Sequence, residues 1–212
     1  MSNIMMQIRK KAQGEELDYT FIMDCLKDYK SPRTKLTMLL KNEDLIRAKK
    51  GIYLFGQDYR KTEYSPEIIA NKIYGPSYVS REYALSYYGL IPEYVTEITS
   101  VTTKRSRNFN TPIGRFSYSH LPIEYYSAGF TIVQIRNNAT CLFATAEKAL
   151  SDLFYLRESN PQTVSELKDI LFEDLRLDEE VLSRMKIGMI KNILKAGGPD
   201  VLRLLIEWLE KE

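Results

Sequence analysis

The spacing of apolar residues predicts three short helices and a β-hairpin at the start of the chain. Apolar residues recur at helical spacing over residues 3–13, after Asp18 and after Ser31, where Leu36, Leu39 and Leu40 share one face. Asp and Ser are common helix caps, and Pro32 suits the first helical position. Short apolar runs at 45–48 and 51–55 surround a Lys-Lys-Gly turn, which predicts two strands. This order predicts a helix-turn-helix followed by a basic wing.

The face of the third predicted helix opposite its leucines carries side chains suited to DNA. Arginine and lysine neutralise phosphates, and polar or methyl-bearing side chains read base edges in the major groove. The residues predicted at base edges are Arg33, Thr34, Lys35, Thr37 and Met38, and those predicted on phosphates are Lys41, Arg47, Lys49 and Lys50. The alternative is a helical unit whose charges are only solvated, with Met38 in a core or against another domain. The clustering of six cations between residues 33 and 50 favours DNA.

Beyond a linker at 56–66, the pattern changes from helix to strand and back to helix. It predicts helices at 66–75 and 81–88, strands at 95–103, 114–121, 130–136 and 140–144, and a turn at Asn137-Asn138. Helices follow from Thr145, with Asp152 outward, then at 163–174 and 178–196 and after Gly197-Gly198-Pro199. The predicted fold class is α+β, with a winged helix-turn-helix domain at 1–60. A second domain at 61–212 combines a mostly antiparallel sheet with C-terminal helices.

Composition excludes some classes of protein and adds an uneven charge. The 212 residues are 44% hydrophobic and 27% charged, and no apolar run approaches the ~20 residues of a membrane span. No apolar run follows the basic residues near the N-terminus, so we expect no signal peptide and a cytoplasmic protein. The net charges of residues 1–60, 61–157 and 158–212 are +4, +2 and −4, which directs nucleic acid to the N-terminal half.

Few residues support catalysis or metal binding. Cys25 and Cys141 lie in apolar runs and are expected to be buried, and the single histidine, His120, is expected to be structural. A nuclease-like Glu166-Leu167-Lys168 with Asp152 upstream lies in a helical pattern, whereas that chemistry needs a strand. No phosphate-binding glycine loop or nucleophile elbow occurs. We therefore predict no enzyme, no cofactor and no metal.

A second basic cluster, Lys104, Arg105 and Arg107, follows a predicted strand. Its cations are candidates for phosphate contacts on DNA beyond the wing or on RNA, and the alternative is a charged hairpin tip that stays soluble. Several of the 15 tyrosines lie near cations. They are candidates for base stacking on RNA or, as the more ordinary interpretation, for packing.

Short blocks through the middle of the chain resemble a known family. They are YVS at 78–80, ALSYYGLIPE at 84–93, TSVTT at 99–103 with Arg105 and Arg107, TPIG at 111–114, HLP at 120–122 and ATAEKALSDL at 144–153. This ordered set resembles the AbiEi-type antitoxins of bacterial type IV toxin–antitoxin systems, which are regulators of abortive phage-defence loci, over roughly residues 15–160.

The resemblance implies two functions and no enzymatic activity. A winged helix would bind inverted repeats in the promoter of its own operon and repress transcription. The second domain would act as an antitoxin against a nucleotidyltransferase-like toxin, with direct contact between the two proteins left open. The alternative is a protein-binding module that holds a toxin or another partner, with the winged helix as a scaffold.

Overall fold

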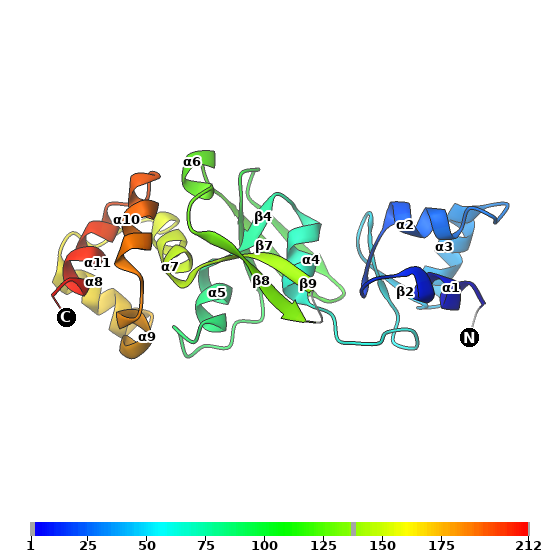
Figure 1. Cartoon of the computed structure of the whole chain (residues 1–212), viewed down its shortest axis with the longest axis horizontal. Coiled ribbons are helices and arrows are strands. Elements are labelled where there is room, and N and C mark those ends of the chain that lie inside the picture. The colour runs from blue at the N-terminus through cyan, green and yellow to red at the C-terminus, as the bar shows by residue number, and fades with distance from the viewer. Residues whose placement is uncertain (1–2, 137–138, 212) are drawn as a thin grey trace.

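The computed structural model describes residues 3–136 and 139–211. Three blocks follow one another along the longest axis: the N-terminal unit (residues 3–60), a central sheet with its helices, and the C-terminal helices (Figure 1). The fold is mixed α and β with two mostly antiparallel sheets, as the sequence predicted. The turn predicted at Asn137-Asn138 lies outside the described residues.

The N-terminal unit contains three helices and a three-stranded antiparallel sheet of order β1-β3-β2. The helices are α1 (Asn3–Lys11), α2 (Tyr19–Cys25) and α3 (Pro32–Lys41), and the strands are β1 (Glu16–Asp18), β2 (Leu45–Lys49) and β3 (Ile52–Phe55). Asp18 caps α2 as predicted, because its carboxylate accepts the Phe21 N–H at 2.7 Å. Ser31 precedes α3, but its hydroxyl lies 2.7 Å from the Thr34 hydroxyl instead of capping a backbone N–H.

Two glycines allow the hairpin to fold back against α3. Gly51, in the β2–β3 turn, has φ 94°, which side-chain-bearing residues rarely adopt. Gly56 approaches the chain after α3 so closely that a Cβ there would lie 1.8 Å from the Glu43 carbonyl oxygen. The backbone contact at Gly56 therefore holds the end of β3 beside the end of α3.

The central sheet has six strands in the order β6-β7-β5-β4-β9-β8. They are β4 (Ser77–Val79), β5 (Ile98–Thr102), β6 (Arg107–Thr111), β7 (Gly114–His120), β8 (Phe130–Arg136) and β9 (Ala139–Ala144). Two neighbouring pairs, β5–β7 and β4–β9, are parallel and the other three are antiparallel. After β5 the chain first forms β6 at the edge of the sheet and then turns back as β7, which lies between β6 and β5. Because β6 and β7 are antiparallel, β7 runs in the same direction as β5.

Helices surround this sheet and form the far end of the molecule (Figure 1). Beside the sheet are α4 (Pro66–Ile73), α5 (Arg81–Tyr87), α6 (Ile123–Tyr126) and α7 (Ala146–Tyr155). The C-terminal helices are α8 (Val164–Lys168), the π-helical turn η1 (Asp169–Asp174), α9 (Glu179–Ser183), α10 (Ile187–Lys195) and α11 (Val201–Leu209). The single helix predicted at 178–196 is wrong. The chain leaves the helix where the Lys186 N–H donates to the Glu147 carboxylate of α7 at 2.9 Å.

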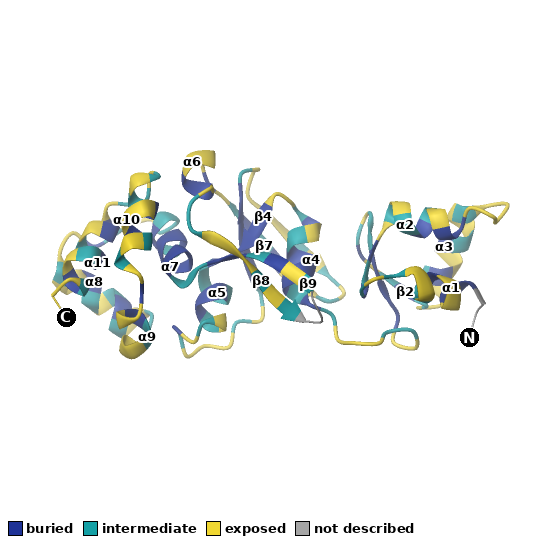
Figure 2. Ribbon diagram, viewed as in Figure 1, coloured by how far each residue is buried: buried dark blue, intermediate teal, exposed yellow. Residues whose placement is uncertain are grey.

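Within the residues that the structure describes, two hydrophobic clusters hold the chain together, and buried positions follow the inner strands and α7 (Figure 2). The smaller cluster joins α1, α2 and α3 to the N-terminal sheet. The larger one joins the central sheet to its helices and also includes Ala48 of β2 and Leu54 of β3. The hairpin thus contributes apolar side chains to the core of the rest of the chain.

A polar cluster lies within the larger core, and it corrects the outward placement predicted for Asp152. The Asp152 and Lys148 side chains are both 0% exposed, and their charged atoms lie 3.0 Å apart. The other Asp152 oxygen accepts the Ser80 hydroxyl at 2.6 Å and the Tyr78 hydroxyl at 3.3 Å. Lys148 also donates to the Tyr125 carbonyl at 2.9 Å. Burial raises the pKa of Asp152 and lowers the pKa of Lys148, and their attraction opposes both changes.

Membrane-spanning helices and metal-binding clusters are both absent from the part of the chain that the structure describes. Among residues 3–136 and 139–211, none of the helices has the length and apolar character that crossing a bilayer requires. In the same ranges, the His, Cys, Asp and Glu side chains form no group of three or more able to hold a metal ion. Cys25 and Cys141 are free and buried, as predicted, and burial raises the pKa of Cys141 to about 12.

Candidate nucleic-acid interface

Helix α3 presents an exposed polar face on the N-terminal unit. Leu36 and Leu39 are buried in the smaller hydrophobic cluster, as their spacing predicted. The side chains exposed on α3 are those of Arg33, Thr34, Thr37, Met38 and Lys41, and Lys35 is half-buried. Met38 is 52% exposed, so it lies outside both hydrophobic clusters rather than in a core. The fold therefore brings the predicted α3 residues to one accessible surface.

Local contacts decide which groups on this face can donate or accept. Thr37 donates its hydroxyl proton to the Arg33 carbonyl at 3.0 Å, which leaves its oxygen as an acceptor. The Lys35 ammonium lies 5.4 Å from the centre of the Tyr29 ring. This cation–π contact leaves its N–H groups able to donate hydrogen bonds to a ligand. A face with cationic donors, hydroxyls and one flexible thioether can make both hydrogen bonds and methyl contacts with base edges.

The hairpin carries two exposed cations and one cation that is hydrogen-bonded to another part of the chain. Arg47 and Lys50 are exposed, consistent with their predicted approach to phosphate. Lys49 is half-buried, and its ammonium donates to the Ile73 carbonyl at the end of α4 at 2.7 Å. Its role on phosphate stays a prediction: one of its three N–H groups is used within the chain, by a carbonyl that lies outside the hairpin. No local sequence pattern indicates this contact, because the two residues lie 24 positions apart.

The second basic cluster lies beside the hairpin. The Lys49 ammonium is 4.4 Å from the centre of the Phe109 ring and 5.6 Å from that of Tyr74. Arg107 lies 5.7 Å from the same Phe109 ring, and Lys104 lies 5.3 Å from the same Tyr74 ring. The two rings are in contact, with centroids 5.5 Å apart. The fold thus joins cations that the sequence places more than 50 positions apart.

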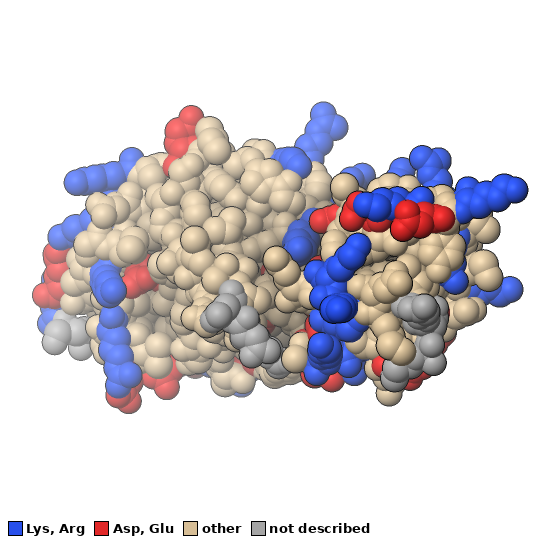
Figure 3. Space-filling view, turned by 45° about the vertical axis from the view of Figure 1, so that its right-hand side comes forward, with Lys and Arg blue, Asp and Glu red and all other residues tan. Residues whose placement is uncertain are grey.

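This grouping of cations affects Lys49. Burial lowers its pKa first, and the charges of Arg107 and Lys104 lower it further. In the part of the chain that the structure describes, no salt bridge links Lys49, Lys50, Lys104, Arg105 or Arg107 to a carboxylate. Figure 3 shows lysine and arginine side chains gathered over the N-terminal unit and along its border with the central sheet, with acidic side chains among them.

The loop that carries Lys104 and Arg105 is held in place by His120. Its Nδ1 lies 3.0 Å from the Lys104 carbonyl oxygen, and its backbone N–H donates to the Ser106 hydroxyl at 2.9 Å. Because a carbonyl only accepts, Nδ1 carries the proton in this contact. His120 has these structural contacts, in agreement with its predicted role.

Three of the tyrosines that lie near cations in the sequence are in packing positions. Tyr78, Tyr125 and Tyr126 are buried in the larger core. The Tyr125 ring stacks on Tyr155 with centroids 4.3 Å apart, and the Tyr78 ring stacks on Phe130 at 5.2 Å. These buried rings are not available for stacking on bases.

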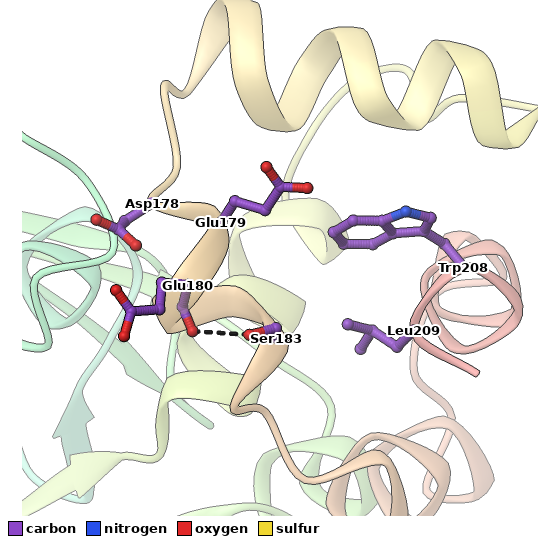
Figure 4. A pocket seen from close by; sticks show the side chains of 6 residues that line it. All are labelled: Asp178, Glu179, Glu180, Ser183, Trp208 and Leu209. Atoms are coloured by element: carbon purple, nitrogen blue, oxygen red, sulfur yellow. Dashed lines mark hydrogen bonds between the residues drawn. The ribbon is translucent and has the colours of Figure 1, made fainter. Parts of the chain in front are cut away.

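The C-terminal helices offer a different kind of cavity. A pocket of about 520 Å³ is lined by Asp178, Glu179, Glu180, Ser183, Trp208 and Leu209. Figure 4 shows the carboxylates on one side, the Trp208 indole on the other, and the Ser183 hydroxyl donating to the Glu180 carbonyl. Three carboxylates repel phosphate, so this pocket does not extend the basic surface. Glu166 lies in helix α8, which does not provide the strand that the nuclease-like pattern would need.

These observations leave the basic face and border as the candidate site. No protein-family model and no curated protein matches this chain. The family resemblance therefore stays a prediction from the sequence blocks.

Proposed function

We propose that the chain is a sequence-specific DNA-binding repressor in which residues 1–60 form a winged helix. The observation that carries the proposal is the exposed cationic and polar face of α3, backed by buried leucines and followed by a hairpin with exposed Arg47 and Lys50. A DNA duplex is the ligand that matches both features, since its groove admits a helix and its phosphates flank the groove.

The element order of the N-terminal unit supports the winged-helix interpretation. Helices α2 and α3 are joined by a short turn, and β2 and β3 form an antiparallel hairpin directly after α3. Strand β1 closes the sheet on the other side of β3. In this arrangement α3 would be the recognition helix and the hairpin would be the wing.

The proposal divides the residues by role. Arg33, Thr34, Lys35, Thr37 and Met38 would approach base edges, and Lys41, Arg47 and Lys50 would contact phosphates. Glu43 and Asp44 lie two and three positions after Lys41 in the sequence, which weakens the attraction for phosphate at that corner. Lys49 would hold the wing against the rest of the chain.

The first test is a mobility-shift titration of the full chain with the DNA upstream of its own gene. We expect retardation of that fragment at protein concentrations at least about tenfold below those needed for an unrelated duplex of equal length, because specific contacts add to phosphate contacts. Raising the salt should weaken both complexes. Failure to retard either duplex at low salt would contradict the proposal.

We further propose, on the sequence resemblance, that the chain is an antitoxin in a type IV toxin–antitoxin system for phage defence. Residues 61–212 would then counter a nucleotidyltransferase-like toxin, with or without direct contact. We expect co-expression of the full chain to restore the growth of cells that produce such a toxin from the neighbouring gene. The Arg33→Ala/Lys35→Ala variant should restore growth equally well, because its changes lie on α3. Growth arrest despite accumulation of the full chain would contradict this role.

A further inference from the structure

The cations of the central sheet and those of the hairpin form one surface around a pair of aromatic rings. The Phe109 ring is approached by Lys49 from the hairpin and Arg107 from β6, and the Tyr74 ring by Lys49 and Lys104. Lys50 neighbours Lys49 at the hairpin tip, and Arg105 lies between Lys104 and Arg107 in the sequence. Lys50, Lys104, Arg105 and Arg107 are all exposed.

Hydrogen bonds to neighbouring segments fix the loop that carries Lys104 and Arg105. Lys104 donates to the Gly75 carbonyl, and the Tyr74 hydroxyl donates to the Arg105 carbonyl at 3.2 Å. His120 holds the same loop from β7 through its contact with the Lys104 carbonyl. These contacts hold the backbone in place and leave two of the three Lys104 N–H groups for a ligand.

Like charges held this close repel one another, and an anion relieves that repulsion. We infer that Lys104, Arg105 and Arg107 form a second phosphate-binding surface, continuous with the hairpin, that contacts the backbone of the same duplex bound by α3. The inference rests on the proposed function and deepens it, since it assigns part of DNA binding to the central sheet. Phosphate contacts carry no sequence information, so this surface would add affinity on every sequence.

Lys49 is a positioning residue in this arrangement. Its ammonium ties the hairpin to the Ile73 carbonyl and to both rings, and the cations of the hairpin and of the β5–β6 loop are thereby held side by side. A duplex lying along α3 would then pass from the hairpin tip onto the β5–β6 loop. The DNA segment covered should accordingly exceed what a helix and wing contact alone.

The test compares the full chain with two variants that each lose three cations. The first is Lys104→Gln/Arg105→Gln/Arg107→Gln, in which glutamine keeps a donor for the Gly75 carbonyl. The matched control is Lys191→Gln/Lys195→Gln/Arg203→Gln on the exposed surface of α10 and α11. Circular dichroism and the unfolding midpoint verify that both variants fold as the parent does.

Binding is measured on the upstream fragment and on an unrelated duplex between about 50 and 200 mM salt. We expect the first variant to bind both duplexes about 10- to 100-fold more weakly, with the salt slope flattened by about 1 per lost contact, and the control to match the parent. Parent-like affinity and slope in the first variant would overturn the inference and leave the proposed function intact. A similar loss in the control would also overturn it. If the parent retards neither duplex, both fail.

Discussion

Asp152→Ala is expected to lower the free energy of unfolding by about 3–5 kcal/mol, because it leaves the Lys148 ammonium buried without its counter-charge. Both side chains are 0% exposed, so water cannot replace the lost carboxylate. The Ser80 and Tyr78 hydroxyls would also lose the oxygen to which they donate. Urea unfolding of the full chain, followed by circular dichroism, measures the change.

Two further variants test whether the loss of stability comes from the charge that Asp152→Ala leaves unpaired in the core. Asp200→Ala removes the carboxylate of an exposed pair with Arg203 and should change stability by no more than about 0.5 kcal/mol. Lys148→Met/Asp152→Leu removes both buried charges and should recover much of the loss, because neither charge is left alone. A loss below about 1 kcal/mol for Asp152→Ala, against the expected range, would mean that water or another group takes over the role of the carboxylate.

Local patterns predicted the elements that matter most to the site. The leucine spacing of α3, Pro32 at its start and the glycine of the β2–β3 turn are signals within a few residues of one another, and the structure has the helix and hairpin at those positions. The strands of three residues, β1 and β4, were missed because an alternating pattern needs more positions to be recognised. The order of the central sheet depends on pairings between distant segments, which a local pattern does not encode.

The contacts of two side chains, Lys49 and Asp152, were missed for the same reason. Lys49 looked like one more wing cation, but its ammonium contacts the Ile73 carbonyl and the rings of Tyr74 and Phe109. These residues come from distant parts of the sequence. Asp152 looked like a solvated helix position, but Ser80, more than 70 positions earlier, reaches it in the core. A Lys-Asp pair four residues apart on a helix is most often a surface feature. In this protein the Lys148–Asp152 pair is buried in the core, because α7 packs on the central sheet, and the local sequence does not indicate that packing.

Arg33→Ala/Lys35→Ala is expected to weaken binding to the upstream DNA fragment by about 2–6 kcal/mol if the two losses add, since each base contact contributes about 1–3 kcal/mol. Both residues lie on α3, Arg33 exposed and Lys35 half-buried against Tyr29. Alanine is the best helix former, so the helix itself is not weakened. On an unrelated duplex the same variant should lose far less binding free energy, because contacts to specific base edges contribute nothing to that complex.

Competition titrations with the two duplexes at one salt concentration give the ratio of affinities that this prediction concerns. Lys191→Ala/Lys195→Ala on α10 removes the same number of charges from exposed positions and should leave that ratio unchanged. Arg47→Ala/Lys50→Ala on the hairpin should weaken both complexes alike, because phosphate contacts are blind to sequence. An equal loss on both duplexes for the α3 variant would place Arg33 and Lys35 on phosphates rather than on base edges, and recognition by α3 would then be wrong.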